Sequence, residues 1–229
     1  MSGKIEVVDR GKERQLIING TIQGFSVKHD MLGELRRGYR GKIYRSPFGV
    51  PTNPNVLLCG LKAGMIVTLV EQDLHPSAIT VIEQDPEIIA IVKKYFLRED
   101  LKNVRFLTHS ASEELVKLNS LNEKFDLIID NIFYHPTWIN VNQELLLADR
   151  CAALLTSNGS IVFHRAIDGR KAEERTRQFI STLVNSGFNV KTIQVLQRWS
   201  SKLIFCQPNK LYTRDKLRGS QQYMTEHAL

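Results

Sequence analysis

The chain has 229 residues, of which 42% are hydrophobic, and a formal net charge of +7. This is enough for one α/β domain with its own core and a small appendage, and it excludes two domains of equal size. The three cysteines, Cys59, Cys151 and Cys206, form no Cys-x-x-Cys pair. We therefore expect reduced thiols, no metal site and a cytoplasmic location. The sequence contains neither a signal-peptide pattern nor an apolar run as long as a membrane span, so we expect a soluble protein without membrane contact.

Charge is unevenly distributed along the chain. Residues 51–164 are net acidic, whereas the segments before and after them are basic, and the densest basic stretch, 35–45, interleaves arginines with tyrosines. Such a stretch can bind the phosphates of a nucleic acid. It can equally be a surface segment whose arginines pair with acids of the core or of a second subunit, and we favour this second interpretation.

The first 54 residues are predicted to form a β appendage and a linker. Alternating patterns predict strands at 4–8, 14–18 and 21–27, with an Asn-Gly turn at 19–20 between the last two. The segment 28–54 is predicted to be an irregular linker, because three prolines occur near its end.

Between residues 55 and 207 strands and helices alternate. Strands are predicted at 56–59, 78–83, 103–107, 125–130 and 160–164, and helices at 62–72, 86–96, 110–119, 141–155 and 170–185, before a hairpin of 188–196 and 201–207. The alternation predicts a parallel sheet with helices on both faces and an antiparallel closing hairpin. The fold class is therefore α/β, a Rossmann-like seven-stranded sheet of the S-adenosylmethionine-methyltransferase type. The tail, 208–229, has few apolar residues and is not expected to fold.

The most informative motif lies in residues 56–83. An apolar strand leads into a turn with Gly60 and Gly64, and the second strand ends on Glu83, 19 residues after Gly64. Glycines permit close approach of the backbone, and an acid at the tip of the second strand can accept hydrogen bonds from ribose hydroxyls. This arrangement predicts a nucleoside-binding site, although any parallel α/β sheet can place a glycine and an acid at these points.

Further candidate residues follow the carboxyl ends of the first four core strands, where ligands bind in such sheets. Beside the glycines and Glu83 they are Gln84 after the second strand, Ser110 and Ala111 after the third, and Asp130 and Asn131 after the fourth. Asp85 precedes Pro86 and is a candidate helix cap instead.

The segments RQLIINGTIQG, NVLLCGLKAG, HPSAITVIEQDPEIIAIVKKYF, HSASEEL and KFDLIIDNIF resemble spermidine synthases and spermidine-synthase-like proteins in order and spacing. The resemblance covers roughly residues 15–165. It implies a nucleoside site that binds S-adenosylmethionine or its decarboxylated form, with Gln23 over the ligand and Glu83 on its ribose. It also implies a small-molecule acceptor, a catalytic role for Asp130 or Asn131, and a homodimer or higher oligomer paired through the N-terminal strands.

The chain departs from that family at three carboxylates. Ala63, Ser110 and Asn131 stand where the family has acids that bind the amine, bind the adenine and accept the proton, and only a one-residue shift would let Asp130 serve as the base. Lys62 places a cation where a decarboxylated ligand would carry its amine, and is either a carboxylate-binding residue or an exposed lysine at the start of a helix. Three hypotheses remain: a spermidine-synthase-like transferase with an altered acceptor, a methyltransferase on the same fold, and a non-catalytic binding or assembly relative.

Overall fold

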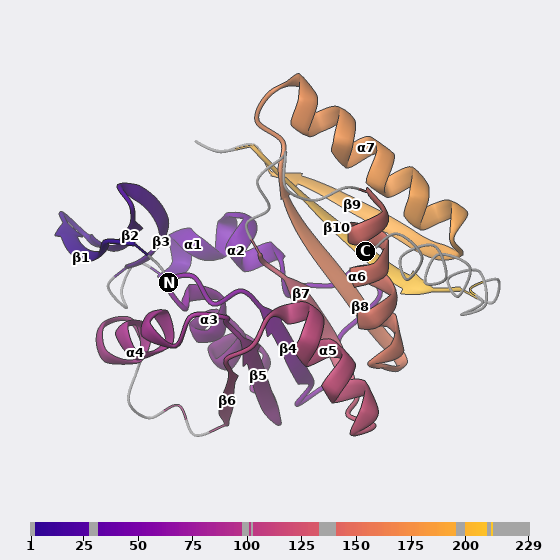
Figure 1. Cartoon of the computed structure of the whole chain (residues 1–229), viewed down its shortest axis with the longest axis horizontal. Helices are drawn as coiled ribbons and strands as arrows, with labels where there is room; N and C mark the ends of the chain where they lie inside the picture. Colours follow the sequence, from indigo (N-terminus) through magenta and orange to yellow (C-terminus); the bar gives the residue numbers. More distant parts are fainter. Residues whose placement is uncertain are drawn as a thin grey trace, which may run out of the picture.

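The computed structural model describes residues 3–27, 32–97, 101, 103–132, 141–195, 200–209 and 212. A small N-terminal sheet lies at one end of the molecule and a large sheet flanked by helices makes up the rest (Figure 1). The polar and aromatic segment 133–140, in which Phe133, Tyr134 and Trp138 are a candidate lid and His135 a candidate acid or base by sequence, and nearly all of the tail lie outside the described residues.

The small sheet consists of three antiparallel strands, β1 (Ile5–Arg10), β2 (Glu13–Ile18) and β3 (Thr21–Val27), in the order β1-β2-β3. Asn19 and Gly20 between the last two strands both have positive φ, 50° and 75°. A two-residue turn of this conformation matches the twist of the strands it joins, which explains the Asn-Gly pair. The predicted strands and turn are confirmed.

The prediction of an irregular linker is wrong for part of 28–54. Two short helices, α1 (Leu32–Arg37) and α2 (Tyr39–Lys42), precede the proline-rich stretch. Leu32, Ile43 and Tyr44 are nearly or fully inaccessible to solvent, and they pack in the same hydrophobic cluster as the large sheet. The segment is ordered because it covers one face of that sheet, which local propensity does not reveal.

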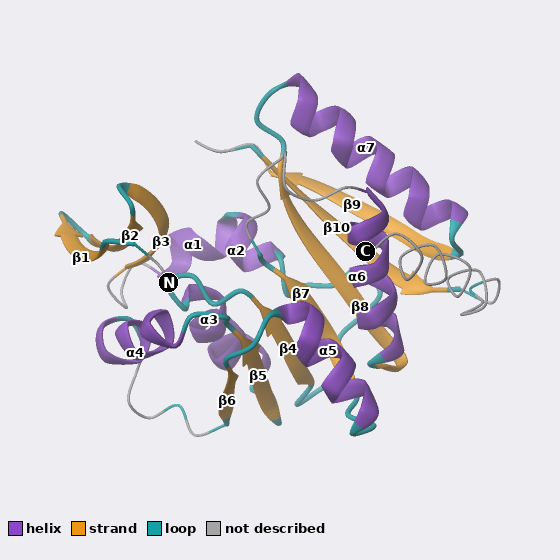
Figure 2. Ribbon diagram, in the orientation of Figure 1, coloured by secondary structure: helices purple, strands orange, loops and turns teal. Residues whose placement is uncertain are grey.

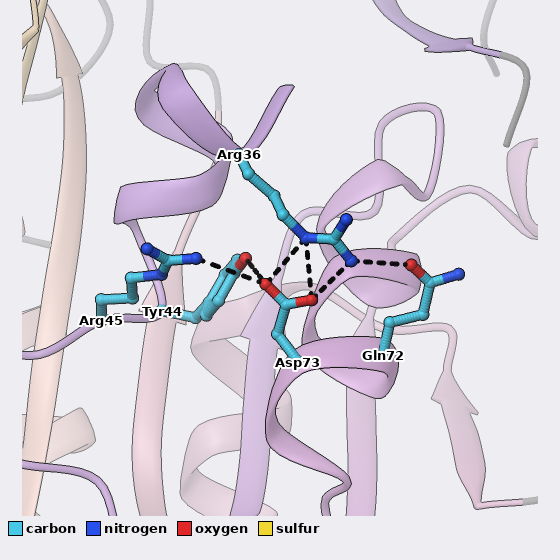
Figure 3. A network of polar contacts seen from close by, with 5 residues as sticks. All are labelled: Arg36, Tyr44, Arg45, Gln72 and Asp73. Atoms are coloured by element: carbon cyan, nitrogen blue, oxygen red, sulfur yellow. Dashed lines mark hydrogen bonds and ion pairs between the residues drawn. The ribbon is translucent and has the colours of Figure 1, made fainter. Parts of the chain in front are cut away.

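A polar cluster fixes this segment to helix α3 (Met65–Leu74) (Figure 3). The guanidinium of Arg36 donates to both carboxylate oxygens of Asp73, and Arg36 Nη2 also reaches Oε1 of Gln72 at 3.1 Å. The hydroxyl of Tyr44, whose side chain is fully buried, donates to Oδ2 of Asp73 at 2.6 Å. Nη2 of Arg45 lies 3.5 Å from the same oxygen. The carboxylate of Asp73 therefore contacts three residues of the segment, on both sides of α2.

The large sheet has seven strands in the order β6-β5-β4-β7-β8-β10-β9. In chain order they are β4 (Asn55–Cys59), β5 (Ala78–Ile82), β6 (Val104–Leu107), β7 (Phe125–Asp130), β8 (Leu155–Ala166), β9 (Phe188–Val195) and β10 (Ser201–Pro208). The first five are parallel to one another, and β10 is antiparallel to both β8 and β9. The predicted parallel sheet with an antiparallel closing hairpin is confirmed. Strand order reverses between β4 and β7, which makes their carboxyl ends the switch point.

Helices cover both faces of this sheet (Figure 2). Alternate residues of a strand point to opposite faces. Val56 and Leu58 accordingly belong to the core with α3 and α4 (Pro86–Tyr95), whereas Leu57 and Cys59 belong to the core with α5 (Ala111–Ser120), α6 (Val141–Ala153) and α7 (Arg170–Asn185). Burial on both faces explains why these strands read as continuous apolar runs.

Candidate functional site at the carboxyl end of the sheet

The loop after β4 is shaped by its two glycines. Gly60 has φ 89°, and a Cβ on it would lie 3.1 Å from the backbone of Asn131. Gly64 has φ 70° and caps α3, and a Cβ there would lie 2.7 Å from Cδ2 of Leu97. Both positions need glycine for conformation and for packing against neighbouring segments. Lys62, between them, also has a positive φ of 50°, so the helix predicted to begin at residue 62 begins at Met65.

Glu83 directly follows β5 and faces this loop. Its Oε2 accepts the backbone N–H of Leu61 at 3.2 Å and its Oε1 accepts that of Asp85 at 3.2 Å. Partial burial raises the pKa of Glu83, while these backbone hydrogen bonds act in the opposite direction. An ionised carboxylate has about four lone-pair sites. Two hydrogen bonds therefore leave Glu83 capacity to accept from a ligand.

The remaining candidates on this side of the site have local roles at helix starts. Asp85 caps α4 by accepting from the N–H of Glu87 at 2.9 Å, as its place before Pro86 suggested. Ser110 forms a capping box with Glu113 at the start of α5, so its hydroxyl is engaged by the helix. Ala111 is the first residue of α5, and Gln84 is exposed next to Glu83.

Asp130 and Asn131 point in different directions from the end of β7. Asp130 is fully buried, and its Oδ2 accepts from Nη1 of Arg165 at 2.8 Å while Oδ1 accepts from the N–H of Ile132. Asn131 instead faces the glycine loop, where its Nδ2 donates to the carbonyl of Gly60 at 3.3 Å. The strand thus turns the amide of Asn131 toward the glycine loop and the carboxylate of Asp130 into the core.

Gln23 occupies a bulge in the small sheet. Leu16 of β2 pairs with Gly24, and the adjacent Ile17 pairs with Ile22, so Gln23 is the extra residue on β3. A Cβ on Gly24 would lie 2.9 Å from the backbone nitrogen of Ala63. The bulge therefore rests against the glycine loop, and bulges commonly re-aim side chains beside ligand sites.

Four residues that sequence reasoning did not place at the site complete this edge of the sheet: Tyr39, Arg40, His164 and Arg165. Tyr39 stacks on His164 with ring centroids 4.2 Å apart, and Nε2 of His164 lies 3.0 Å from Oγ of Ser201. Burial, and then the charges of Lys62, Arg165 and Arg40, hold the pKa of His164 well below its ordinary value, so the ring is neutral near pH 7. His164 and Arg165 could have been found by extending the carboxyl-end rule to the fifth strand. Tyr39 and Arg40 lie in the basic stretch 35–45.

The described residues contain no cluster of His, Cys, Asp or Glu that could hold a metal ion. Within the same part of the chain, no helix is long and apolar enough to cross a membrane.

Solved structures with the same fold are methyltransferases and related proteins. Human methyltransferase-like protein 13 in complex with SAH has a TM-score of 0.55 and 13% identity, over 86% of this chain and 89% of that chain. Fibrillarin from Aeropyrum pernix with natively bound S-adenosyl-L-methionine has a TM-score of 0.57 and 13% identity, over 90% and 99%. A putative SAM-dependent methyltransferase from Streptococcus mutans has a TM-score of 0.60 and 11% identity, over 87% of this chain and 56% of that longer chain.

These likenesses establish the fold of the SAM methyltransferases for this chain. No protein-family model and no curated protein matches the sequence. The reported structures agree with the methyltransferase alternative and give no specific support to the resemblance to spermidine synthases.

Proposed function

We propose that this chain is an S-adenosylmethionine-dependent methyltransferase that acts on a small-molecule acceptor. The observation that carries the proposal is the carboxylate of Glu83, which lies at the tip of β5 and contacts the loop after β4 at the switch point. The neighbours crystallised with SAH and with S-adenosyl-L-methionine add support, because they share this fold.

The residues of this edge fit an adenosyl ligand. Glu83 keeps acceptor capacity for ribose hydroxyls beyond its two backbone hydrogen bonds. The loop from Gly60 to Gly64 contains three residues in left-handed conformation, and the bulge in β3 that holds Gln23 rests against it. A carboxylate for the ribose, a glycine loop that lets the ligand approach closely and an amide are groups suited to such a ligand.

When bound, S-adenosylmethionine supplies a methyl group activated by its positively charged sulfur. The described residues contribute binding and orientation to this chemistry. Asp130 is engaged by Arg165 and Ile132, and the amide of Asn131 is far too weakly basic to accept a proton near neutral pH. Proximity and orientation suffice for acceptors that are nucleophilic without a strong base.

The charges at this edge also bear on the choice between a methyltransferase and a polyamine aminopropyltransferase. A polyamine carries several positive charges and needs carboxylates around it. Lys62 and Arg40 are cations, and Asp130 is neutralised by Arg165. A cationic acceptor is therefore disfavoured at the described part of the site.

Isothermal titration with S-adenosylmethionine, SAH, decarboxylated S-adenosylmethionine and methylthioadenosine tests the proposal. We expect the wild-type chain to bind SAH. Glu83→Gln should weaken that binding by about 1–3 kcal/mol, because charge-assisted hydrogen bonds to the ribose are lost.

Glu87→Gln is the matched control, since Glu87 is an exposed acid only four residues away. It should leave the affinity unchanged. Equal affinities for wild type and Glu83→Gln would remove Glu83 from the site. Transfer from methyl-labelled S-adenosylmethionine to a pool of small acceptors then separates a methyltransferase from a non-catalytic relative.

A further inference from the structure

Two cations lie together at the β7–β8 side of the site. Lys62 and Arg40 are both half-buried, and β3 brings them together: a Cβ on Gly24 would lie 3.4 Å from Cβ of Lys62, and the guanidinium of Arg40 lies over the ring of the adjacent Phe25. The charge of Arg40 also lowers the pKa of Lys62. In the described part of the chain neither side chain forms an ion pair with a carboxylate. Like charges held close together repel each other, and the charge of Asp130 opposes this repulsion at Lys62 without outweighing it.

Lys62 is held in place rather than extended into solvent. Its backbone adopts the left-handed conformation, and its Nζ donates to Oδ1 of Asn131 at 3.2 Å. Burial, followed by repulsion from Arg40, lowers the pKa of Lys62 to about 8, so the amine is mostly charged at neutral pH. One hydrogen bond leaves two ammonium protons for a ligand.

Arg40 is fixed by aromatic rings. Its guanidinium carbon lies 4.2 Å from the ring centroid of Phe25 and 4.6 Å from that of Tyr39. Tyr39 in turn stacks on His164, which is anchored to Ser201. Aromatic contact orients a guanidinium without using its five N–H donors. The group is thus preorganised with its hydrogen-bonding capacity intact.

We propose that Lys62 and Arg40 form a binding site for an acidic group, a carboxylate or a phosphate, on the methyl acceptor. This inference rests on the proposed function and deepens it by naming the substrate class. Two fixed cations whose donors are not taken by carboxylates are suited to an oxyanion, which would also relieve their mutual repulsion.

The position of the pair assigns it to the acceptor rather than to the nucleoside. Glu83 lies on the β5 side of β4, where a ribose would be held, whereas Lys62 bonds to Asn131 at the end of β7. Arg40 lies further along the same edge, next to Tyr39 and His164 of β8. A nucleoside anchored at Glu83 leaves this second half of the switch point for the other substrate.

The test measures thermal stabilisation of SAH-saturated protein by inorganic phosphate, against chloride at equal ionic strength. Wild type should show saturable stabilisation. Lys62→Met and Arg40→Met should each weaken the apparent phosphate affinity about tenfold or more, because each removes charge-assisted hydrogen bonds. Lys12→Met and Arg37→Met, which remove exposed cations of the N-terminal segment, should match wild type.

Affinity for SAH serves as the second measurement and shows that each variant is folded. Unchanged SAH binding with lost phosphate binding supports the inference. Retained phosphate binding in both variants overturns it. The inference is also overturned if the variants bind S-adenosylmethionine more weakly than wild type does but bind its decarboxylated form equally well. The two cations would then hold the carboxylate of S-adenosylmethionine itself. Failure of wild type to bind SAH would instead refute the proposed function.

Discussion

At the scale of single residues, the end of β7 shows how a shift of one position in sequence changes the environment of a side chain. Asp130 and Asn131 are adjacent in sequence, yet the alternation of a strand sends their side chains to different environments. Asp130 joins Arg165, which also contacts Glu144 at 3.2 Å within the core, whereas Asn131 faces the glycine loop. The sequence indicated both residues as candidates, but only the partner Arg165 shows why the carboxylate is not available to a substrate.

Asp130→Asn should therefore destabilise the protein. The substitution removes a charge-assisted hydrogen bond from the nearly inaccessible Arg165, which keeps its ion pair with Glu144, and we expect a loss of about 1.5–3 kcal/mol in the free energy of unfolding. Denaturant titration measures it. The matched control is Asp9→Asn, which breaks an ion pair with Arg14 in which both side chains are substantially exposed and should cost less than about 1 kcal/mol. Equal unfolding curves for wild type and Asp130→Asn would contradict this structural role.

At the scale of elements, the strands of the large sheet could be predicted because they are buried on both faces and therefore appear in the sequence as continuous apolar runs. The helices between them could be predicted from the alternation of strand and helix patterns. The linker could not, because α1 and α2 are short and gain their stability from packing against the large sheet and from the contacts of Arg36 and Tyr44 with Asp73. Short helices have little stability of their own. The contacts of Arg36 and Tyr44 with Asp73 join residues about 30 positions or more apart, so no local sequence pattern indicates them.

Tyr44→Phe tests the anchoring of this segment. The Tyr44 hydroxyl bonds to the Asp73 carboxylate at 2.6 Å, and burial together with this carboxylate raises the pKa of Tyr44 to about 12. Removing a hydrogen bond to a charged group should cost about 1.5–3 kcal/mol in the free energy of unfolding. Tyr95→Phe, at a tyrosine that is 40% exposed, is the control and should be neutral. Indistinguishable stabilities of the two variants would show that the hydroxyl of Tyr44 does not anchor the segment.

At the scale of the whole molecule, the site could be predicted in part. The switch-point rule placed Gly60, Gly64, Glu83 and Asn131 at one edge of the sheet, where the structure finds them. Arg40 comes from a distant segment, and only the packing of α2 on the sheet, where Tyr39 stacks on His164 of β8, brings it to that edge. Ser110 was predicted as a site residue from its position after the third strand. In the structure its hydroxyl takes part in a capping box with Glu113 at the start of α5. Pairing of two chains through the small sheet stays a prediction.

The stability of the whole chain should depend on pH through Asp149. This aspartate of α6 is largely buried, and burial raises its pKa from 3.8 to about 7, although the hydrogen bond from the Tyr212 hydroxyl acts in the opposite direction. A raised carboxyl pKa means that the folded state holds its proton up to a higher pH than the unfolded state does. The contribution of Asp149 to stability is therefore fully present below about pH 4 and is lost as the pH rises through about 7.

Asp149→Asn removes the titration while keeping the shape of the side chain. At pH 8 the variant should be more stable than wild type by about 1–2 kcal/mol, a value reduced from the full linkage energy because the side chain is not completely shielded from water. At pH 4 both proteins carry a neutral group, so their free energies of unfolding should coincide. Denaturant titrations at the two pH values measure the difference. A stability difference that is the same at both pH values would show that the substitution acts through packing or hydrogen bonding instead of through the charge of Asp149.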